Sequence, residues 1–369
     1  MRKLIITASA FLLTMMVNAQ QDSYEVSNLI ELKEFLSQKT HANEFSGVVL
    51  IAKDGKPIFE EAYGYSSKRF DIKNNTDTKF NIGSLSKHFT SIAILQLAEK
   101  GLLNLNDTIG KYLDYFPKEI SGKVTVMQLI NMKSGWGDYW DNAYYVSYRY
   151  NLRSVSDYMK FIKDMPLEFE NGSEGNHSNT GFEVAGAIIE KITEMNYFDY
   201  IRENIYAPAG MLNTDSYDID NESIKNLAVG YTNEHPCDTV KRIYDWSNTY
   251  LRLPAKGSPT GGSYSTAEDL LKFDQAIRSF KLLNEDYTTF LLNLFIGSVG
   301  DPFMMNKGIL HYLGGAEGVG AVYGQDLMNK DFSKGYTIVV LTNYDFQNAI
   351  DVYEVVKNFV YKLKEQEGK

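Results

Sequence analysis

Cysteine is nearly absent from this chain, since Cys237 is the only one among 369 residues. A single cysteine excludes an internal disulfide, so an oxidising compartment is allowed but is not used to hold the fold together. It also argues against a lipid anchor attached through cysteine. Long apolar runs are scarce as well, because the N-terminal run Leu4–Val17 is shorter than the ~20 residues that a membrane helix needs.

The N-terminal segment has the pattern of an export signal. The cations Arg2 and Lys3 precede the apolar run, and Val17-Asn18-Ala19 follows it with small residues at the spacing of a signal-peptidase site. We therefore expect residues 1–19 to be a signal peptide, Gln20 to be the new N-terminus, and the protein to be periplasmic or secreted. An uncleaved anchor is the alternative.

Basic residues are also fewer than acidic residues. The whole chain has 37 basic and 47 acidic residues, and removal of the leader leaves 35 basic residues and a net charge of −12. Such a balance argues against nucleic acid or an anionic membrane as a partner, which leaves a small-molecule or peptide substrate. A hydrophobic fraction of 44% with 13% aromatic residues predicts a sizeable core. The oligomeric state stays open.

Strand signals gather near both ends of the chain and helical signals lie between them. This order predicts an α/β fold of the α+β type, with a central antiparallel sheet built from both chain ends, flanking helices and a mainly helical inserted domain. Residues 20–106 and 256–369 are expected to form the sheet domain, and residues 107–255 the insertion. The expected elements are strands near 47–52, 58–65, 318–324 and 336–342, and helices near 27–38, 84–100, 267–280 and 350–363.

Ser84-Leu85-Ser86-Lys87 is the first candidate site, and it is the only place where a lysine follows a serine by three residues. On a helix these positions share a face, so the hydroxyl and the amine can touch. An amine that has lost its water can be neutral and accept the serine proton. The alternative is an ordinary helix cap followed by a surface lysine.

Two polar or glycine-rich segments are the other candidates. Residues 175–181 form a polar loop before a helical run, and residues 314–318 lead into a predicted strand. Glycine at the start of a strand allows a close approach of backbone to ligand. Each segment taken singly is also compatible with an ordinary turn.

Together the three motifs resemble class C β-lactamases, DD-peptidases and their esterase relatives. Flanking segments agree in the correct order over nearly the whole mature chain: Phe80-Asn81-Ile82-Gly83, the run from Gly101 to Asp107, Asn179-Thr180-Gly181-Phe182, Gly186 to Glu190, Gly210-Met211 and Gly261-Gly262 before Ser265 to Leu270. The resemblance implies a serine hydrolase of the β-lactamase/transpeptidase fold that needs no cofactor.

The resemblance also implies roles for individual residues. Ser84 would be acylated, and Lys87 would activate it. Asn179 would hold a substrate amide or orient Lys87. The backbone N–H groups of Ser84 and Gly315, in the Gly314-Gly315 pair, would form the oxyanion hole, in which one donor is worth about 2.7–4 kcal/mol in a well-studied protease.

The sequence departs from the family pattern at two positions. The family has Tyr-x-Asn where this chain has His177-Ser178-Asn179, and it has Lys or His where this chain has Tyr312. In a rival alignment His311 takes the third-motif position. Because histidine changes charge near neutral pH, His177 is expected to transfer protons in the reaction.

Tyr312 carries no charge and Glu317 adds a negative one, so a substrate carboxylate should be bound poorly. This favours esters, or amides without a free carboxylate. The alternative function is a catalytically degenerate member that binds cell-wall peptide or a protein partner.

An aromatic group and a possible metal motif complete the candidates. The aromatic residues between 136 and 150 are expected either to form a wall for an apolar substrate group or to be packing. His235-Pro236-Cys237-Asp238 has no second ligand pair at usable spacing, so no metal is expected. The aromatic residues are Trp136, Tyr139, Trp140, Tyr144, Tyr145, Tyr148 and Tyr150.

Overall fold

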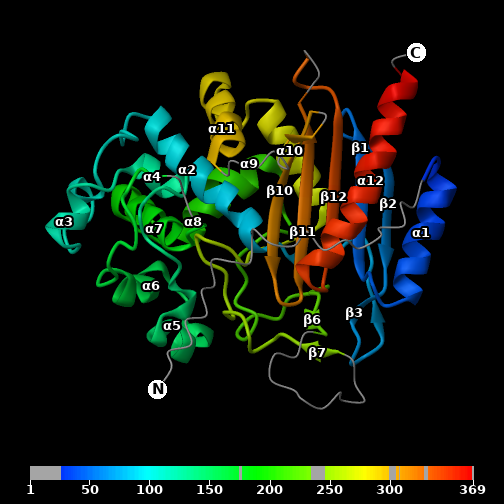
Figure 1. Cartoon of the computed structure of the whole chain (residues 1–369), viewed down its shortest axis with the longest axis horizontal. Helices are drawn as coiled ribbons and strands as arrows, with labels where there is room; N and C mark the ends of the chain where they lie inside the picture. The colour runs from blue at the N-terminus through cyan, green and yellow to red at the C-terminus, as the bar shows by residue number, and fades with distance from the viewer. Residues whose placement is uncertain are drawn as a thin grey trace.

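A six-stranded antiparallel sheet lies at the centre of the fold, with the strand order β2-β1-β12-β11-β10-β9 (Figure 1). The computed structural model describes residues 26–173, 177–233, 246–298, 305–306, 308–327 and 331–367. The expected sheet built from both ends of the chain is confirmed. Its strands are β1 (Gly47–Lys53), β2 (Lys56–Tyr63), β9 (Met305–Asn306), β10 (Ile309–Ala316), β11 (Val319–Asp326) and β12 (Tyr336–Thr342).

Short strand pairs and helical turns connect this sheet to the rest of the chain. The short strands are β3 (Tyr65–Ser67), β4 (Ile72–Lys73), β5 (Phe80–Asn81), β6 (Tyr231–Thr232), β7 (Ser247–Asn248) and β8 (Tyr264–Ser265). The short helical turns are η2 (Gly83–Ser86), η3 (Ile109–Lys111), η4 (Tyr139–Asp141), η5 (Arg149–Asn151) and η6 (Arg202–Tyr206). The predicted signal segment and the His235-Pro236-Cys237-Asp238 motif lie outside the described residues.

Helices cover both faces of the sheet (Figure 1). One core joins the sheet to α1 and α12, and a second, larger core joins its other face to α2, α10 and the helical part of the chain. The helices are α1 (Leu29–His41), α2 (Lys87–Glu99), α3 (Lys118–Ser121), α4 (Val126–Ile130), α5 (Ala143–Tyr148), α6 (Val155–Ile162), α7 (Thr180–Thr193), α8 (Tyr197–Ile201), α9 (Ala207–Ala209), α10 (Ala267–Arg278), α11 (Glu285–Ser298) and α12 (Phe346–Glu367).

Strand β1 shows why its sequence is a continuous apolar run. Val48 and Leu50 point into the core shared with α2 and α10, whereas Val49 and Ile51 point into the core shared with α1 and α12. Successive side chains of a strand point to opposite faces, so a strand covered on both faces needs apolar residues throughout.

The helical part of the chain, α3 to α9, lies to one side of the sheet (Figure 1). Its central helix α7 is buried from Thr180 to Ile189. Helix α7 packs against α2, α4 and α6. Because α7 is fixed on α2, the residue that precedes it, Asn179, is held close to the start of α2.

Three local expectations need correction. The helix expected at 84–100 begins as the 3₁₀ turn η2 before α2. The pattern Ser265-Thr266-Ala267-Glu268 is that of a capping box with Ser265 as the cap, but Thr266 caps α10, because its side chain accepts a hydrogen bond from the amide of Asp269. Residues 362–369 are mostly charged or polar, as expected of a solvated tail, yet α12 continues to Glu367, and Lys364 forms a 2.8 Å ion pair with Asp326.

A buried ion pair joins α10 to the sheet. Arg278 Nε donates to Asp274 Oδ2 at 2.8 Å, and the rest of the guanidinium donates to backbone carbonyls around β11 and β12. Asp274 also accepts hydrogen bonds from Tyr323 and Thr337. Both members of the pair are almost fully buried, so each depends on the other for its charge balance.

Replacing Arg278 with methionine should therefore lower the free energy of unfolding by ~3–5 kcal/mol, because Asp274 would be left buried without its cation. Urea unfolding followed by circular dichroism measures this change. Lys163→Met is the control, since Lys163 pairs with Asp164 at the surface and such pairs contribute below ~1 kcal/mol. Equal losses in the two variants would contradict the assignment.

Candidate active site

Ser84 and Lys87 lie where strand β5 leads through η2 into α2. Lys87 Nζ is 3.0 Å from Ser84 Oγ, so the expected contact between hydroxyl and amine is present. The same nitrogen donates to Asn179 Oδ1 and to the Thr260 carbonyl, both at 2.7 Å. Three oxygens from three segments of the chain therefore surround one amine.

Burial changes the proton affinity of this amine. Lys87 is 2% exposed, and the loss of water lowers its pKa to about 8, against the opposing effect of the nearby carboxyl groups of Asp138 and Glu183. A lysine with such a pKa is partly neutral near neutral pH. A neutral amine in contact with a serine hydroxyl can accept its proton.

Asn179 links this pair to the helical part of the chain. Its Oδ1 accepts from Lys87 and from Thr260 Oγ1, and its Nδ2 donates to Asp138 Oδ2 at 2.6 Å. The amide is thus held from both sides and faces the amine. Of the two roles expected for Asn179, this geometry directly provides the orientation of Lys87, and Asn179 also lines the cavity at Ser84.

The glycine pair of the third motif leads into β11, as expected, and it also forms the end of β10, a strand that was not predicted. A Cβ on Gly314 would lie 2.0 Å from the Ile82 carbonyl oxygen, and a Cβ on Gly83 would lie 2.9 Å from the Gly315 nitrogen. Only glycine allows backbone segments to approach this closely. The contact brings the backbones of Ser84 and Gly315 to one cavity, as an oxyanion hole requires.

The structure decides between the two alignments of the third motif. Tyr312 belongs to the core on the α2 face of the sheet, whereas His311 packs against Tyr353 of α12 on the opposite face. Neighbouring residues of a strand point to opposite faces, so His311 cannot turn toward Ser84 without a shift of register. Of the two candidates, Tyr312 is therefore the one on the α2 face of the sheet.

Tyr312 nevertheless lies inside the core. It is 2% exposed, makes an edge contact with His88 at 4.2 Å between ring centroids, and stacks on Tyr323. Burial raises the pKa of Tyr312 far above its usual range. Tyr312 is not among the described residues that line the cavity at Ser84, so its expected contact with substrate stays a prediction.

His177 takes a half-exposed position beside the site. Its Nδ1 is 3.5 Å from Asp138 Oδ2, and 47% of its side chain is exposed. Through Asp138 and Asn179 it is connected to Lys87. His177 is likewise absent from the described cavity lining.

The charges near the third motif differ from those expected. Glu317 forms a 3.0 Å ion pair with Arg252, so its negative charge is offset. Lys256 lines the cavity itself, with its Nζ 4.3 Å from the centroid of the Phe198 ring. The sequence gave no signal for this cation, because Lys256 belongs to none of the three motifs.

The cavity around Ser84 is open to solvent, and the space within it, open solvent included, is about 500 Å³. The expected aromatic group divides into two parts. Trp136 is buried in the core, whereas Tyr144 and Tyr148 are exposed, with their rings in tilted contact at 4.7 Å between centroids. The aromatic wall of the cavity, by contrast, consists of Tyr139, Trp140, Tyr145 and Tyr158.

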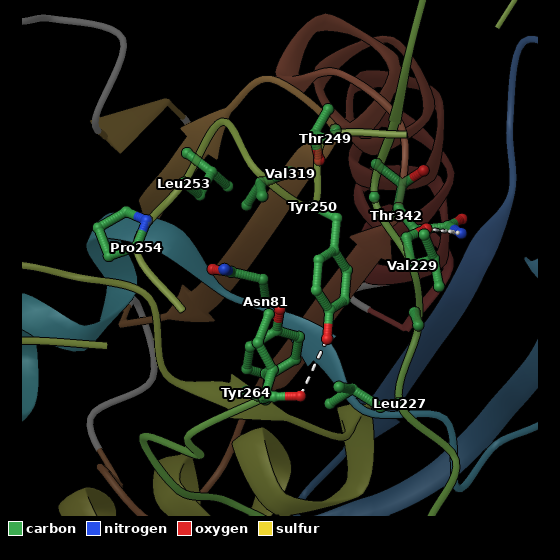
Figure 2. A pocket seen from close by; sticks show the side chains of 15 residues that line it. Asn81, Leu227, Val229, Thr249, Tyr250, Leu253, Pro254, Tyr264, Val319 and Thr342 are labelled. Atoms are coloured by element: carbon green, nitrogen blue, oxygen red, sulfur yellow. Dashed lines mark hydrogen bonds between the residues drawn. The ribbon is translucent and has the colours of Figure 1, made fainter. Parts of the chain in front are cut away.

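A second cavity adjoins the first and shares Asn81, Leu253 and Pro254 with it. Figure 2 shows Asn81 in the middle of this second lining, with Leu253 and Pro254 on one side and tyrosines on the other. One of these, Tyr250, donates to the Ile219 carbonyl at 2.9 Å. Among the described residues, no cluster of three or more His, Cys, Asp or Glu side chains is placed to hold a metal.

Sequence reasoning missed three polar groups of the site: Asp138, the Thr260 carbonyl and Glu183. Asp138 and Thr260 act through contacts between distant segments, and a single sequence does not reveal such contacts. Glu183 had a local signal, since it follows Asn179 by four residues and so shares its helix face.

The geometry predicts how activity depends on pH. Because only the neutral amine of Lys87 can take the serine proton, the rate of Ser84 acylation should rise about tenfold per pH unit below the pKa and level off above about 8. Stopped-flow measurement with p-nitrophenyl acetate between pH 6 and 10 tests this, with Ser84→Ala as the background. A rate independent of pH would exclude Lys87 as the base.

Comparison with known proteins agrees with this geometry. A family model described as Beta-lactamase matches residues 32–357. The chain is 31% identical over 255 residues to penicillin-binding protein 4* of Bacillus subtilis, a match that covers 68% of this chain but only 55% of that relative.

Solved structures show the same fold. A penicillin-binding protein from Bacillus halodurans superposes with a TM-score of 0.73 at 26% identity, covering 87% of this chain and 99% of that one. The D-amino acid amidase of Ochrobactrum anthropi, solved with L-phenylalanine amide, gives a TM-score of 0.69 at 18% identity, covering 92% and 100%. The chain therefore belongs to the Beta-lactamase family.

Proposed function

We propose that this protein is an exported serine hydrolase that forms an acyl-enzyme on Ser84 with ester or amide substrates. The observation that carries the proposal is the contact between Ser84 Oγ and the buried amine of Lys87. The export signal at residues 1–19 supports the location outside the cytoplasm.

The reaction has two halves. In the first, Ser84 Oγ attacks the substrate carbonyl carbon while its proton passes to Lys87 Nζ. The backbone N–H groups of Ser84 and Gly315 stabilise the oxyanion, and the C–O or C–N bond then breaks as the leaving group takes a proton. Lys87 passes the proton that it took from Ser84 to the group that protonated the leaving group, so the amine is neutral again. In the second half, water attacks the acyl carbon and gives a proton to Lys87, which returns it to Ser84 Oγ as the acyl bond breaks and the acid product leaves.

His177 is proposed to supply the proton that the leaving group needs. It stands beside Asp138 at a half-exposed position, so it can exchange protons with solvent. Because it does not line the cavity, this role requires a bridging water or a small movement of the loop when substrate binds.

The cavity favours substrates with an aromatic or apolar acyl group. Its wall presents the faces and edges of four aromatic side chains close to Ser84. The D-amino acid amidase of similar fold was solved with the amide of an aromatic amino acid, which is consistent with this preference. Tyr312 carries no positive charge, so a substrate carboxylate would form its ion pair with Lys256, which lines the cavity.

The nucleophile can be tested by intact-protein mass spectrometry after incubation with p-nitrophenyl phenylacetate. We expect a phenylacetyl adduct on the wild type, and none on Ser84→Ala, because that variant lacks the hydroxyl that contacts the amine of Lys87. Benzylpenicillin in a parallel sample should react much more slowly, since the third motif lacks its cation.

Absence of an adduct from both reagents, with a folded protein, would contradict the hydrolase proposal and support a family member that only binds cell-wall peptide or a protein. Efficient turnover of benzylpenicillin would instead contradict the proposed preference for substrates without a carboxylate.

The role of His177 has its own test, which compares two leaving groups on the same acyl group. His177→Gln should lower kcat about tenfold or more for an anilide, whose nitrogen must be protonated, but much less for a p-nitrophenyl ester, whose leaving group needs no proton. His41→Gln, at the exposed end of α1, is the control. Equal effects on both substrates would exclude His177 as the acid.

A further inference from the structure

A fully buried carboxyl group lies directly behind the cavity wall. Glu183 is 0% exposed, one helical turn after Asn179 on α7. Its Oε1 accepts a 3.1 Å hydrogen bond from Tyr139 and a 2.5 Å hydrogen bond from Ser258. Its Oε2 is buried without a hydrogen-bond partner among the described residues. The reaction proposed above gives this group no role.

Both partners of Glu183 belong to the site. Tyr139 is part of the aromatic wall, and Ser258 lines the same cavity. Ser258 also closes a tight turn, because its amide donates to the Gly261 carbonyl at 2.7 Å and its own carbonyl accepts from the Gly261 amide. The Thr260 carbonyl within this turn is the one that accepts from Lys87 at 2.7 Å. Two hydrogen bonds, joined by this turn, therefore connect Glu183 to the amine of Lys87.

The charge state of Glu183 fits a position inside an apolar wall. Burial raises the pKa of Glu183 to about 8, although hydrogen bonds from Ser258 and Tyr139 and the charge of Lys87 act in the opposite direction. At pH 7 the neutral acid therefore predominates. The titratable groups around Glu183 and Lys87 are Asp138 and Tyr139 near η4, Tyr145 of α5, Tyr158 of α6 and Tyr197 of α8.

We propose that Glu183 is a positioning residue for the Ser84–Lys87 pair. Its carboxyl group fixes Ser258, and through the turn that contains Thr260 it fixes the carbonyl that directs Lys87 toward Ser84. The same carboxyl group fixes Tyr139 and so joins the substrate wall to the catalytic amine. This inference rests on the proposed function of Ser84 and Lys87.

A neutral acid is required in this place. A carboxylate close to Lys87 would favour the protonated amine and raise its pKa, which would reduce the amount of base available at neutral pH. The neutral form keeps the acceptor that Tyr139 and Ser258 need without adding a charge. When Glu183 ionises in alkaline solution, it places a negative charge near Lys87 and so favours the protonated amine.

Glu183→Gln and Glu183→Leu separate the acceptor from the charge. The steady-state kinetics of p-nitrophenyl phenylacetate hydrolysis should be followed from pH 6 to 10, with circular dichroism as the check of folding. Glu190→Gln is the matched control, since Glu190 lies on the same helix but accepts from the backbone of Tyr197, away from the cavity lining.

Glutamine retains a carbonyl oxygen for both hydrogen bonds, so kcat of Glu183→Gln at pH 7 should stay within about threefold of the wild type. Leucine has no acceptor, and kcat of Glu183→Leu should fall about tenfold or more while KM changes less. The pH at which the rate reaches half its maximum should move lower in Glu183→Gln, because no carboxylate remains to hold the proton on Lys87.

A folded Glu183→Leu with wild-type kcat would overturn the inference, and so would a Glu183→Gln variant whose kcat at pH 7 falls as far as that of Glu183→Leu. If Glu183→Leu does not fold, Ser258→Ala removes the same hydrogen bond from the other side, and wild-type kcat in that variant would overturn the inference. A wild type that forms no Ser84 adduct refutes the proposed function and this inference with it, whereas an active wild type with indifferent Glu183 variants refutes only the inference.

Discussion

The exclusion of water from the amine of Lys87 is the constraint on which the site depends. A lysine in water is almost always protonated and cannot take a proton from serine. Here α2, α7 and the turn at Thr260 meet on one nitrogen and replace its water with three oxygens. None of these elements is close to the others in sequence, so the chemistry is a property of the packed fold and not of any one motif.

The second requirement is close contact between backbones. The turn that carries Ser84 lies against the end of β10 so tightly that a side chain at Gly314 would overlap a carbonyl oxygen. The sheet, built from both ends of the chain, provides the rigid edge for this contact. The helical part of the chain provides the aromatic wall on the other side of the cavity. The cavity thus combines a reaction centre with an aromatic wall, and the proposed preference for substrate depends on that wall.

Much of this arrangement could be predicted from the sequence. Apolar runs bounded by turn residues predicted the strands β1, β2, β11 and β12. The Ser-x-x-Lys spacing predicted the contact of Ser84 with Lys87. The start of α10 at Ala267 was predicted correctly, but its cap was assigned to Ser265 and not to Thr266, because both residues are good caps. The buried position of Tyr312, the cation at Lys256 and the carboxyl of Glu183 were not predicted, since each is defined by which distant side chains pack around it.

The pairing of β1 with β12 has a consequence for how the protein comes to be active. In this pair Gly47 lies opposite Thr342, so the central strands of the sheet join the first and last parts of the chain. Contacts between such distant residues form slowly, and they cannot form before the C-terminal strand has been made. The edge that supports Gly315 is therefore completed late in folding. Until the last strand has been made, the chain carries Ser84 without the completed sheet beside it.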